Sequence, residues 1–466
     1  MKAVAAFWET LAAGGDSPAI IDGESRETIS YQSLDRRVRD AVGRLRGCSR
    51  ALVLLFANND VGSIVGYLAA LNAGHVLYLC PADARQSAGA GVLHAYRPEL
   101  VLWKGEDPAA FLEHGYEYQD RIEGYLLLCR RDAGPEPLDE SLRLLLSTSA
   151  STGSAKAVRL SGESLRLCAA QVAEALALTP EDRCLLSLPI SYVYGLSVVN
   201  STLHSRGSLV LLRGTLADPA AYPKIHACAV TSIACVSQTF AFMREAGMDS
   251  GRLPTVRRLT HSGSALLPDL FSYAYESFGA AADIYLMYGQ TEACGRISVL
   301  PAGELPQASR SVGKPLRGGS ITIDDEGQIL YRGPGVMMGY AYSRQDLALG
   351  DGCGGLLQTG DIGQLDSNGN LIITGRISRY CKIYEQRLSL DEVEAFVNAV
   401  HPAAVVEKNG ALIIVFEGVD PPASPSVLEL SRRFRLPPQS FHTTTASSLP
   451  RNERGKIAYK TLLTLV

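Results

Sequence analysis

The sequence predicts an α/β protein with a large N-terminal domain of parallel and mixed sheets with flanking helices, a β-rich subdomain, and a small α+β C-terminal domain. Three observations predict this fold. Continuous apolar strands alternate with helical segments from about residue 50, and apolar and polar residues alternate around tight turns after about residue 310. A separate helix and strand follow near the C-terminus. A chain of 466 residues is long enough for two to four such folding units.

The N-terminal part alternates between the two periodicities of a layered α/β fold. Residues 51–57, ALVLLFA, form a continuous apolar strand, and residues 60–74 form a helix that Asp60 caps and Gly74 ends. Further strands are expected over 75–79, 183–189, 208–212, 231–236, 256–260 and 283–288, with helices between them. Unbroken apolar strands joined by helices indicate parallel sheets covered on both faces. Ligands of such sheets bind beyond the carboxyl ends of the strands.

The pattern changes after about residue 310. Residues 320–334 and 363–376 alternate apolar and polar side chains around Asp-Glu-Gly and Asn-Gly-Asn turns. This alternation is typical of antiparallel hairpins. A helix over 389–400 and a strand over 411–417 then begin the small α+β unit.

Composition and charge exclude several classes of protein. Hydrophobic residues make up 46% of the chain and charged residues 20%, and the formal net charge is -4. The sequence has no basic block or basic-aromatic stripe, so we expect no nucleic-acid partner. Ten cysteines are scattered without a C-x-x-C pair, which is typical of a reducing compartment. Because no apolar run approaches the roughly 18 residues needed to cross a bilayer, we predict a cytoplasmic protein without a membrane span.

A hydroxyl-rich segment, STSASTGSAK (147–156), directly follows an apolar strand. Its hydroxyls and the backbone N–H groups around Gly153 can wrap phosphate oxygens, and Lys156 adds a positive charge. The segment does not match the Walker A pattern. A plain loop can have the same composition, so the segment alone leaves both interpretations open.

Two further polar clusters lie at predicted strand ends. Gln290, Thr291 and Glu292 offer an amide, a hydroxyl and a carboxylate, a set that could hold a nucleotide and hydrated Mg²⁺. Asp361 lies in a Thr-Gly-Asp turn, where a carboxylate can accept both hydroxyls of a ribose. Arg376 ends a strand and could meet a phosphate or a ribose. A structural turn and a surface arginine are the alternatives for these last two residues.

Taken in order, these segments resemble the motifs of the AMP-forming adenylating enzyme superfamily, which includes acyl-CoA synthetases, nonribosomal-peptide adenylation domains and beetle luciferases. TSASTGSAKA resembles that family's phosphate loop, and YGQTE matches its Y-G-x-T-E motif. HSGSAL resembles the segment that packs against adenine, TGD and GR follow in family order, and LPRNERGKI resembles the terminal P-x-x-x-x-G-K. The resemblance covers essentially the whole chain, which is most similar to stand-alone acyl- or aryl-acid ligases.

The resemblance implies two domains. Residues 1–376 would form an adenylating domain that binds ATP and the acid, and residues 377–466 a mobile domain that carries a catalytic lysine. This small domain would pivot just past the G-R pair between the two half-reactions. The pivot is Ser378 here, where the family usually has Asp or Lys, and Glu385 replaces a glycine that normally lies close to the pantetheine arm.

The resemblance also implies the site residues and the reaction. The implied ATP-binding residues are Thr148, Ser149, Ser151, Thr152, Gly153, Lys156, Gly263, Ser264, Ala265, Tyr288, Gly289, Gln290, Asp361 and Arg376. Lys456, Thr291 and Glu292 would be catalytic, with Glu292 as the Mg²⁺ ligand. The enzyme would activate a small carboxylic acid to an acyl-adenylate, release pyrophosphate and pass the acyl group to a thiol. Lys456 and Mg²⁺ would neutralise the repulsion between the carboxylate and the phosphates.

The acid pocket is expected among small and aromatic residues. The candidates are Tyr192, Gly195, Ala234, Ser237, Ser262 and Gly263. The segment 188–197 contains no acidic residue that could pair with an ammonium group, so α-amino acids are disfavoured. Small side chains admit either a ring or a short branched acid, and the sequence does not choose between them.

Several alternatives stay open at this point. The thiol could belong to coenzyme A or to an acyl carrier protein, which we would expect to be a separate chain. A catalytically impaired nucleotide-binding relative with a regulatory or scaffold role is the second candidate class. An unrelated hydrolase or dehydrogenase is disfavoured, because no G-x-S-x-G elbow occurs and the one G-x-G-x-x-G match, over 350–355, lies in a loop.

Overall fold

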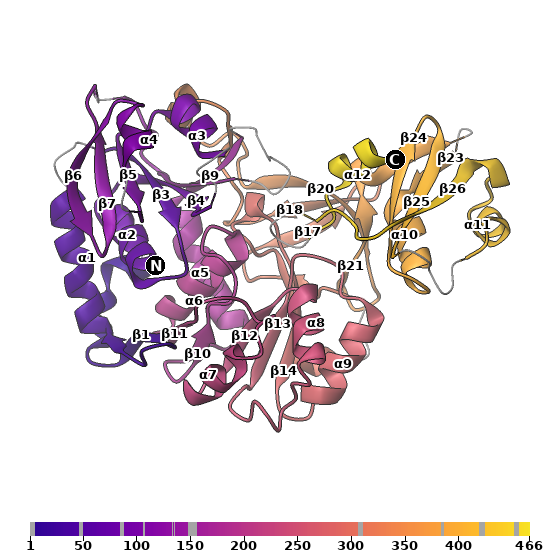
Figure 1. Ribbon diagram of the computed structural model, residues 1–466, viewed down its shortest axis with the longest axis horizontal. Helices are drawn as coiled ribbons and strands as arrows, with labels where there is room; N and C mark the ends of the chain where they lie inside the picture. Colours follow the sequence, from indigo (N-terminus) through magenta and orange to yellow (C-terminus); the bar gives the residue numbers. More distant parts are fainter. Residues whose placement is uncertain are drawn as a thin grey trace. The chain divides into compact units, whose positions relative to one another are not determined.

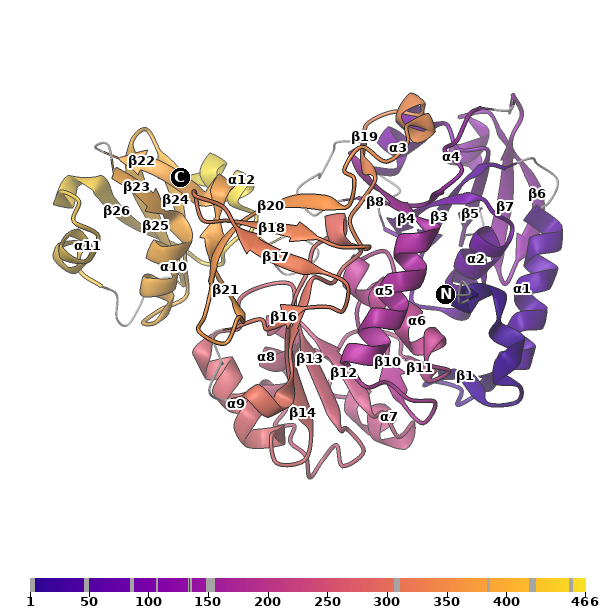
Figure 2. The same cartoon turned by 180° about the vertical axis from the view of Figure 1, so that it is seen from behind.

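The computed structural model describes residues 5–45, 50–83, 88–105, 108–132, 134, 136–147, 156–305, 311–383, 386–418, 425–451 and 456–466. The chain forms two compact units (Figures 1 and 2). Unit 1 comprises Met1–Ser320 and Tyr331–Leu357, and unit 2 comprises Ile321–Leu330 and Gln358–Val466. No helix in the described ranges combines the length and the apolar character needed to cross a membrane.

Unit 1 contains two large mixed sheets, each with parallel strands at its centre. One has the order β19-β9-β8-β4-β3-β5-β7-β6, and the other has the order β16-β15-β14-β13-β12-β10-β11-β1-β2. The strands of the first are β3 (Leu52–Ala57), β4 (Val76–Pro81), β5 (Leu100–Trp103), β6 (Tyr116–Ile122), β7 (Tyr125–Arg130), β8 (Leu142–Ser147), β9 (Ala157–Ser161) and β19 (Gly339–Ala341). Those of the second are β1 (Pro18–Asp22), β2 (Thr28–Ser30), β10 (Arg183–Leu185), β11 (Ser208–Leu211), β12 (Ser232–Cys235), β13 (Arg258–His261), β14 (Asp283–Tyr288), β15 (Ser298–Leu300) and β16 (Lys314–Pro315).

The helices of unit 1 cover these sheets (Figure 1). They are α1 (Tyr31–Leu45), α2 (Val61–Asn72), α3 (Ala88–Tyr96), α4 (Ala109–Leu112), α5 (Gly162–Ala175), α6 (Val193–His204), α7 (Ala221–Ala227), α8 (Ser237–Glu245) and α9 (Pro268–Phe278). α5 packs on β8 and β9, α6 packs on β11, and the two helices contact each other, so they lie between the sheets. The predicted cap of α2 is present, since the Asp60 side chain accepts a hydrogen bond from the Ser63 backbone N–H.

Unit 2 is built from three small sheets. The first contains β17 (Ser320–Ile323), β18 (Gln328–Arg332), β20 (Leu356–Leu365) and β21 (Leu371–Arg376), and the unit boundaries fall within the first three of these strands. The second pairs β22 (Tyr380–Ile383) with β23 (Gln386–Ser389), and the third contains β24 (Ala403–Lys408), β25 (Ala411–Glu417) and β26 (Phe441–Ala446). Its helices are α10 (Leu390–Asn398), α11 (Val427–Phe434) and α12 (Tyr459–Leu465). Its apolar core includes Val393, Val397, Ile414 and Leu430, all buried.

The predicted fold class is confirmed: two parallel-centred sheets with flanking helices, antiparallel hairpins after residue 310 and a small α+β part. The hairpins form where the turns were predicted, because Asp324 and Asp366 accept backbone N–H groups within their own turns. The domain boundary at residue 376 stays a prediction. The predicted boundary separates a fixed part of the chain from a moving part, whereas the two units are compact parts of one conformation and do not show movement.

A buried ionic cluster joins the start of the C-terminal part to its last helix. Arg379 donates to Asp391 and Glu394, each at 2.7 Å, and its guanidinium carbon lies 3.8 Å from the centroid of the Tyr459 ring. The Tyr459 hydroxyl donates to Glu394 Oε1 at 2.5 Å, and the Val405 N–H donates to Oε2 at 2.8 Å. Burial of such a cluster is favourable only while every partner is present.

We therefore expect Tyr459→Phe to destabilise unit 2 by about 2 kcal/mol, because a buried carboxylate loses a charge-assisted hydrogen bond. Hydrogen–deuterium exchange of the α10 amides would measure this loss. Tyr342→Phe is the matched control, since the Tyr342 side chain is exposed. Equal exchange in both variants would contradict the role given to the Tyr459 hydroxyl.

Candidate active site

Four neighbouring parallel strands of unit 1 end at one edge of the nine-stranded sheet. They are β10, β12, β13 and β14, and adjacent members of this group pair in parallel. Parallel strands present their carboxyl ends together, so the segments that follow them share one edge. The predicted acid pocket, the predicted adenine segment and the YGQTE motif follow these strands, as the topology rule anticipated, whereas the phosphate segment follows β8 of the other sheet.

The YGQTE motif leaves β14 in a tight turn. A Cβ on Gly289 would lie 2.2 Å from the Gly295 carbonyl oxygen, so this close backbone approach requires glycine. Tyr288 is buried, and Gln290 Nε2 lies 3.4 Å from its hydroxyl. Thr291 and Glu292 open the short helix η4 (Thr291–Ala293), Thr291 buried and Glu292 half-buried.

Glu292 is held in place by the segment around β19. The Met337 N–H donates to the Glu292 carbonyl at 2.8 Å, and the Tyr340 hydroxyl donates to Glu292 Oε1 at 2.9 Å. Lys156 Nζ lies 3.6 Å from the centroid of the Tyr340 ring. Burial, together with the Glu292 charge, raises the pKa of Tyr340, so its hydroxyl remains a donor at physiological pH. Tyr340 thus brings together Glu292 and Lys156, two predicted site residues from distant parts of the sequence.

The predicted adenine segment meets the start of α8. Ser237 Oγ lies 2.9 Å from Ser264 Oγ and donates to the Ala265 carbonyl at 3.1 Å. His261 Nε2 lies 3.3 Å from the same hydroxyl. Because burial lowers the pKa of His261 to about 4, its ring is neutral near pH 7. Ser264 and Ala265 are exposed.

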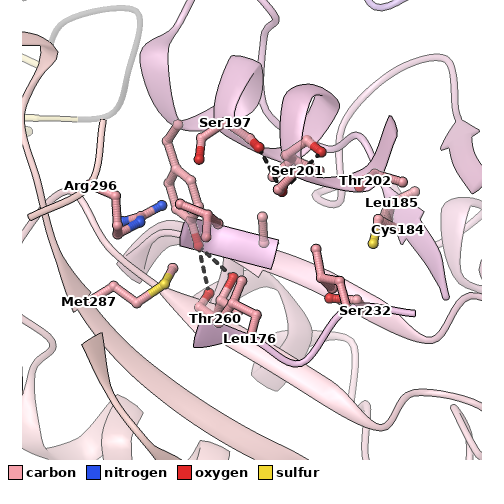
Figure 3. Close-up of a pocket in the computed structure, with 15 residues that line it drawn as sticks. Leu176, Cys184, Leu185, Ser197, Ser201, Thr202, Ser232, Thr260, Met287 and Arg296 are labelled. Carbon is pink, nitrogen blue, oxygen red and sulfur yellow. Dashed lines mark hydrogen bonds between the residues drawn. The ribbon is translucent and has the colours of Figure 1, made fainter. Parts of the chain in front are cut away.

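The predicted acid-pocket residues lie in different surroundings. Tyr192 and Gly263 are adjacent, since a Cβ on Gly263 would lie 2.9 Å from the Tyr192 hydroxyl, and Gly263 has a φ of +100°. Gly195 instead packs on backbone, with a hypothetical Cβ 2.2 Å from the Pro189 carbonyl. Ala234 lines a cavity between α6 and the strands β10, β12, β13 and β14 (Figure 3).

Sequence reasoning did not assign a role to Tyr340 or Arg296. Arg296 lines the same cavity, and its Nη1 donates to Ser262 Oγ at 2.9 Å. The available signal was that Arg296 is the single charged residue in the stretch ACGRISVL (293–300). A charged residue directly before an apolar strand is usually exposed, so its burial was not evident from the sequence.

The remaining predicted residues of unit 2 are placed as follows. Asp361 and Arg376 pair across β20 and β21, and Arg376 Nε lies 2.9 Å from Asp361 Oδ1. Asp361 is buried and Arg376 is exposed. Ser378 is exposed in η7 (Ile377–Arg379), and Lys456 is half-buried shortly before α12.

Six predicted residues lie outside the described ranges. They are Thr148, Ser149, Ser151, Thr152, Gly153 and Glu385. Their roles stay predictions.

Comparison with known families agrees with this arrangement. Residues 7–341 match the sequence profile of a family described as AMP-binding enzyme. The chain belongs to the AMP-binding enzyme family. The match confirms the superfamily that the motifs resembled, and the relatives described next confirm the predicted enzyme class, an AMP-forming acid–thiol ligase.

Two relatives of this AMP-binding enzyme are named as CoA ligases. A 2-succinylbenzoate–CoA ligase of Bacillus subtilis (strain 168) is 28% identical over 338 residues, which cover 67% of each chain. An oxalate–CoA ligase of Arabidopsis thaliana is 28% identical over 274 residues, covering 56% of this chain and 52% of the relative.

Solved structures confirm the fold of the AMP-binding enzyme over nearly its whole length. The O-succinylbenzoate coenzyme A synthetase (MenE) of Bacillus subtilis, in complex with ATP and magnesium ion, superposes with a TM-score of 0.78 at 20% identity, covering 98% of this chain and 99% of that one. ATP-bound MatB from Rhodopseudomonas palustris gives 0.77 at 21% identity, covering 98% of both.

Proposed function

We propose that this AMP-binding enzyme uses ATP and Mg²⁺ to convert a carboxylic acid into an acyl-adenylate, with release of pyrophosphate, and then transfers the acyl group to the thiol of coenzyme A. The acid is an acyl or aryl acid rather than an α-amino acid, because residues 188–197 supply no carboxylate for an ammonium group. The two CoA-ligase relatives favour coenzyme A over a carrier-protein thiol.

The observation that carries this proposal is that Lys156 lies over the ring of Tyr340 while Glu292 accepts a hydrogen bond from its hydroxyl. A lysine that follows a hydroxyl-rich segment and a carboxylate at a strand end are the two charges that an ATP–Mg²⁺ complex needs: one for phosphate oxygens and one for the metal. The arrangement is not explained by an ion pair, since no salt bridge joins these two described side chains. Both charges are therefore available to a bound nucleotide.

The residues present fit Mg²⁺. Mg²⁺ typically uses one or two carboxylates together with phosphate oxygens and waters, and Glu292 supplies one carboxylate whose Oε1 is fixed by the Tyr340 hydroxyl. When bound, the ion would neutralise charge on the triphosphate. The protein's own residues would then orient the reactants: Lys156 and the preceding hydroxyls bind phosphate, Tyr288 stacks on adenine, Thr291 contacts the α-phosphate, and Asp361 binds the ribose hydroxyls.

The chemical difficulty is that a carboxylate must attack a polyanionic phosphate. Lys456 would pair with the acid and the α-phosphate and lower this repulsion, which is electrostatic stabilisation of the transition state. The carboxylate oxygen forms a bond to the α-phosphorus while the bond to pyrophosphate breaks. The thiol then attacks the acyl carbon, losing its proton, and AMP leaves. Residues 377–466 would move between these steps, with the pivot at Ser378.

Acid-dependent ATP–pyrophosphate exchange tests the proposal. Aryl, short-chain and long-chain acids would each be supplied with ATP, Mg²⁺ and labelled pyrophosphate, and the no-acid reaction is the control. We expect exchange with at least one class of acid, and thioester formation when coenzyme A is added. ATP binding without exchange for any acid would contradict the proposal and favour a nucleotide-binding relative without turnover. Exchange followed by transfer only to a carrier protein would correct the acceptor.

A further inference from the structure

Arg296 carries a positive charge in the interior of unit 1. Arg296 is buried, with only 1% of its surface exposed. Nη1 donates to Ser262 Oγ at 2.9 Å, and the guanidinium carbon lies 4.7 Å from the centroid of the Tyr194 ring. Nε has no hydrogen-bond partner within the part of the chain that the structure describes. Among the described residues, no Asp or Glu forms an ion pair with Arg296.

The other buried arginines are compensated. Four of them pair with carboxylates, namely Arg130, Arg258, Arg344 and Arg379. Arg159 donates instead to the carbonyl oxygens of Met338, Leu349 and Gly350. Within the described ranges, Arg296 differs from all five, because it pairs with no carboxylate and a single hydroxyl accepts from its guanidinium.

A charge of this kind is costly unless an anion joins it. Burial lowers the pKa of Arg296, which is the direction expected for a cation without compensation, yet a guanidinium stays protonated near pH 7. A cation–π contact and one hydroxyl offset only part of the desolvation cost of a buried ion. A ligand that brings a negative charge would remove this imbalance.

The surroundings of Arg296 place it beside the predicted acid pocket. Figure 3 shows Arg296 at one side of the cavity, near Met287, with its guanidinium turned inward. Its acceptor Ser262 directly precedes Gly263, which meets the Tyr192 hydroxyl. The cavity wall also contains Ser197 and Thr260, whose hydroxyls suit a polar group. An acid in the proposed pocket would therefore lie next to the guanidinium.

We propose that the acid activated by this enzyme is a dicarboxylic acid whose second carboxylate pairs with Arg296. This inference rests on the proposed function and names its substrate class. The carboxylate that reacts must remain accessible to ATP, whereas Arg296 is enclosed beneath Tyr194 and Ser262. An arginine can receive a carboxylate through two parallel N–H···O bonds, which also fixes the orientation of the acid. Arg296 is thus a specificity residue, and the second carboxylate takes no part in the bond changes.

Pairs of nearly isosteric acids test this assignment. Malonate, succinate and phthalate would each be compared with its monoamide, in which a neutral amide replaces one carboxylate. The wild-type enzyme should favour the preferred diacid over its monoamide by at least about 100-fold in kcat/KM of pyrophosphate exchange, because a buried charged group is left unpaired by the amide. Arg296→Gln should lose this preference, mainly through a higher KM for the diacid and with kcat less changed.

Two controls keep the result interpretable. Arg296→Lys retains the positive charge but cannot form the bidentate pair of hydrogen bonds with a carboxylate, so it should keep part of the preference for the diacid. Calorimetric ATP binding shows whether each variant is folded, and if Arg296→Gln fails this check, the Lys variant and the wild-type comparison decide.

The inference is overturned if wild type uses a monoamide or a simple monoacid as well as any diacid, or if Arg296→Gln lowers both members of a pair equally. In either case exchange itself still supports the proposed function. Absence of exchange with every acid, diacids included, would instead overturn both.

Discussion

Lys456→Ala is expected to lower the rate of acyl-adenylate formation by about 10²–10³-fold, the loss found when one preorganised donor to a developing negative charge is removed. The lysine would act on the repulsion between the carboxylate and the α-phosphate, so its loss should appear in kcat of the first half-reaction. Affinity for ATP should change little. Single-turnover formation of the acyl-adenylate and calorimetric ATP binding would measure the two effects separately.

The structure supplies a matched control for this variant. Lys460 is an exposed lysine on α12, four residues further along the chain, and Lys460→Ala should leave adenylation unchanged. The local fold should tolerate both changes, because the turn before α12 is held by backbone, with the Ala458 N–H donating to the Pro450 carbonyl at 2.7 Å. Near-normal adenylation by Lys456→Ala would refute its catalytic role. Thioester formation from supplied acyl-adenylate should survive in the variant.

Much of the fold was predictable because its signals are local. The apolar run at β3, the Asp60 cap of α2 and the Asp-Glu-Gly and Asn-Gly-Asn turns each act over a few residues, and the structure has all of them. The edge at which predicted ligand segments gather was also predictable, since it depends only on strand direction. Bounds were predicted less closely: the helix predicted over 389–400 is Leu390–Asn398.

The parts of the site that were missed depend on contacts between distant residues. Tyr340 touches Glu292 and Lys156 only after β19 pairs with β9. Arg296 looks like a surface residue in the sequence, and its burial follows from the packing of Tyr194 above it. Neither property can be read from hydrophobic periodicity, because a long-range contact leaves no trace in the local pattern.

Glu292→Gln is expected to lower the rate of adenylation by about 10²–10³-fold at moderate Mg²⁺, because the metal loses its carboxylate ligand. The Mg²⁺ concentration needed for the half-maximal rate should rise for the same reason. This substitution changes the charge alone. Glutamine keeps an oxygen that can accept from the Tyr340 hydroxyl, so the packing of η4 should be preserved. Titration of pyrophosphate exchange with Mg²⁺ would measure both quantities. Glu276→Gln, an exposed carboxylate on α9, is the control and should behave as wild type.

Tyr340→Phe separates positioning from ligation in the same titration. It removes the hydrogen bond to Glu292 Oε1 but keeps the ring on which Lys156 lies, so the carboxylate remains charged and less well oriented. We expect a loss of about tenfold or less, in keeping with the removal of one supporting partner of a metal ligand. An unchanged Mg²⁺ dependence in Glu292→Gln would exclude it as the metal ligand. A loss in Tyr340→Phe as large as that in Glu292→Gln would show that the hydroxyl does more than orient the carboxylate.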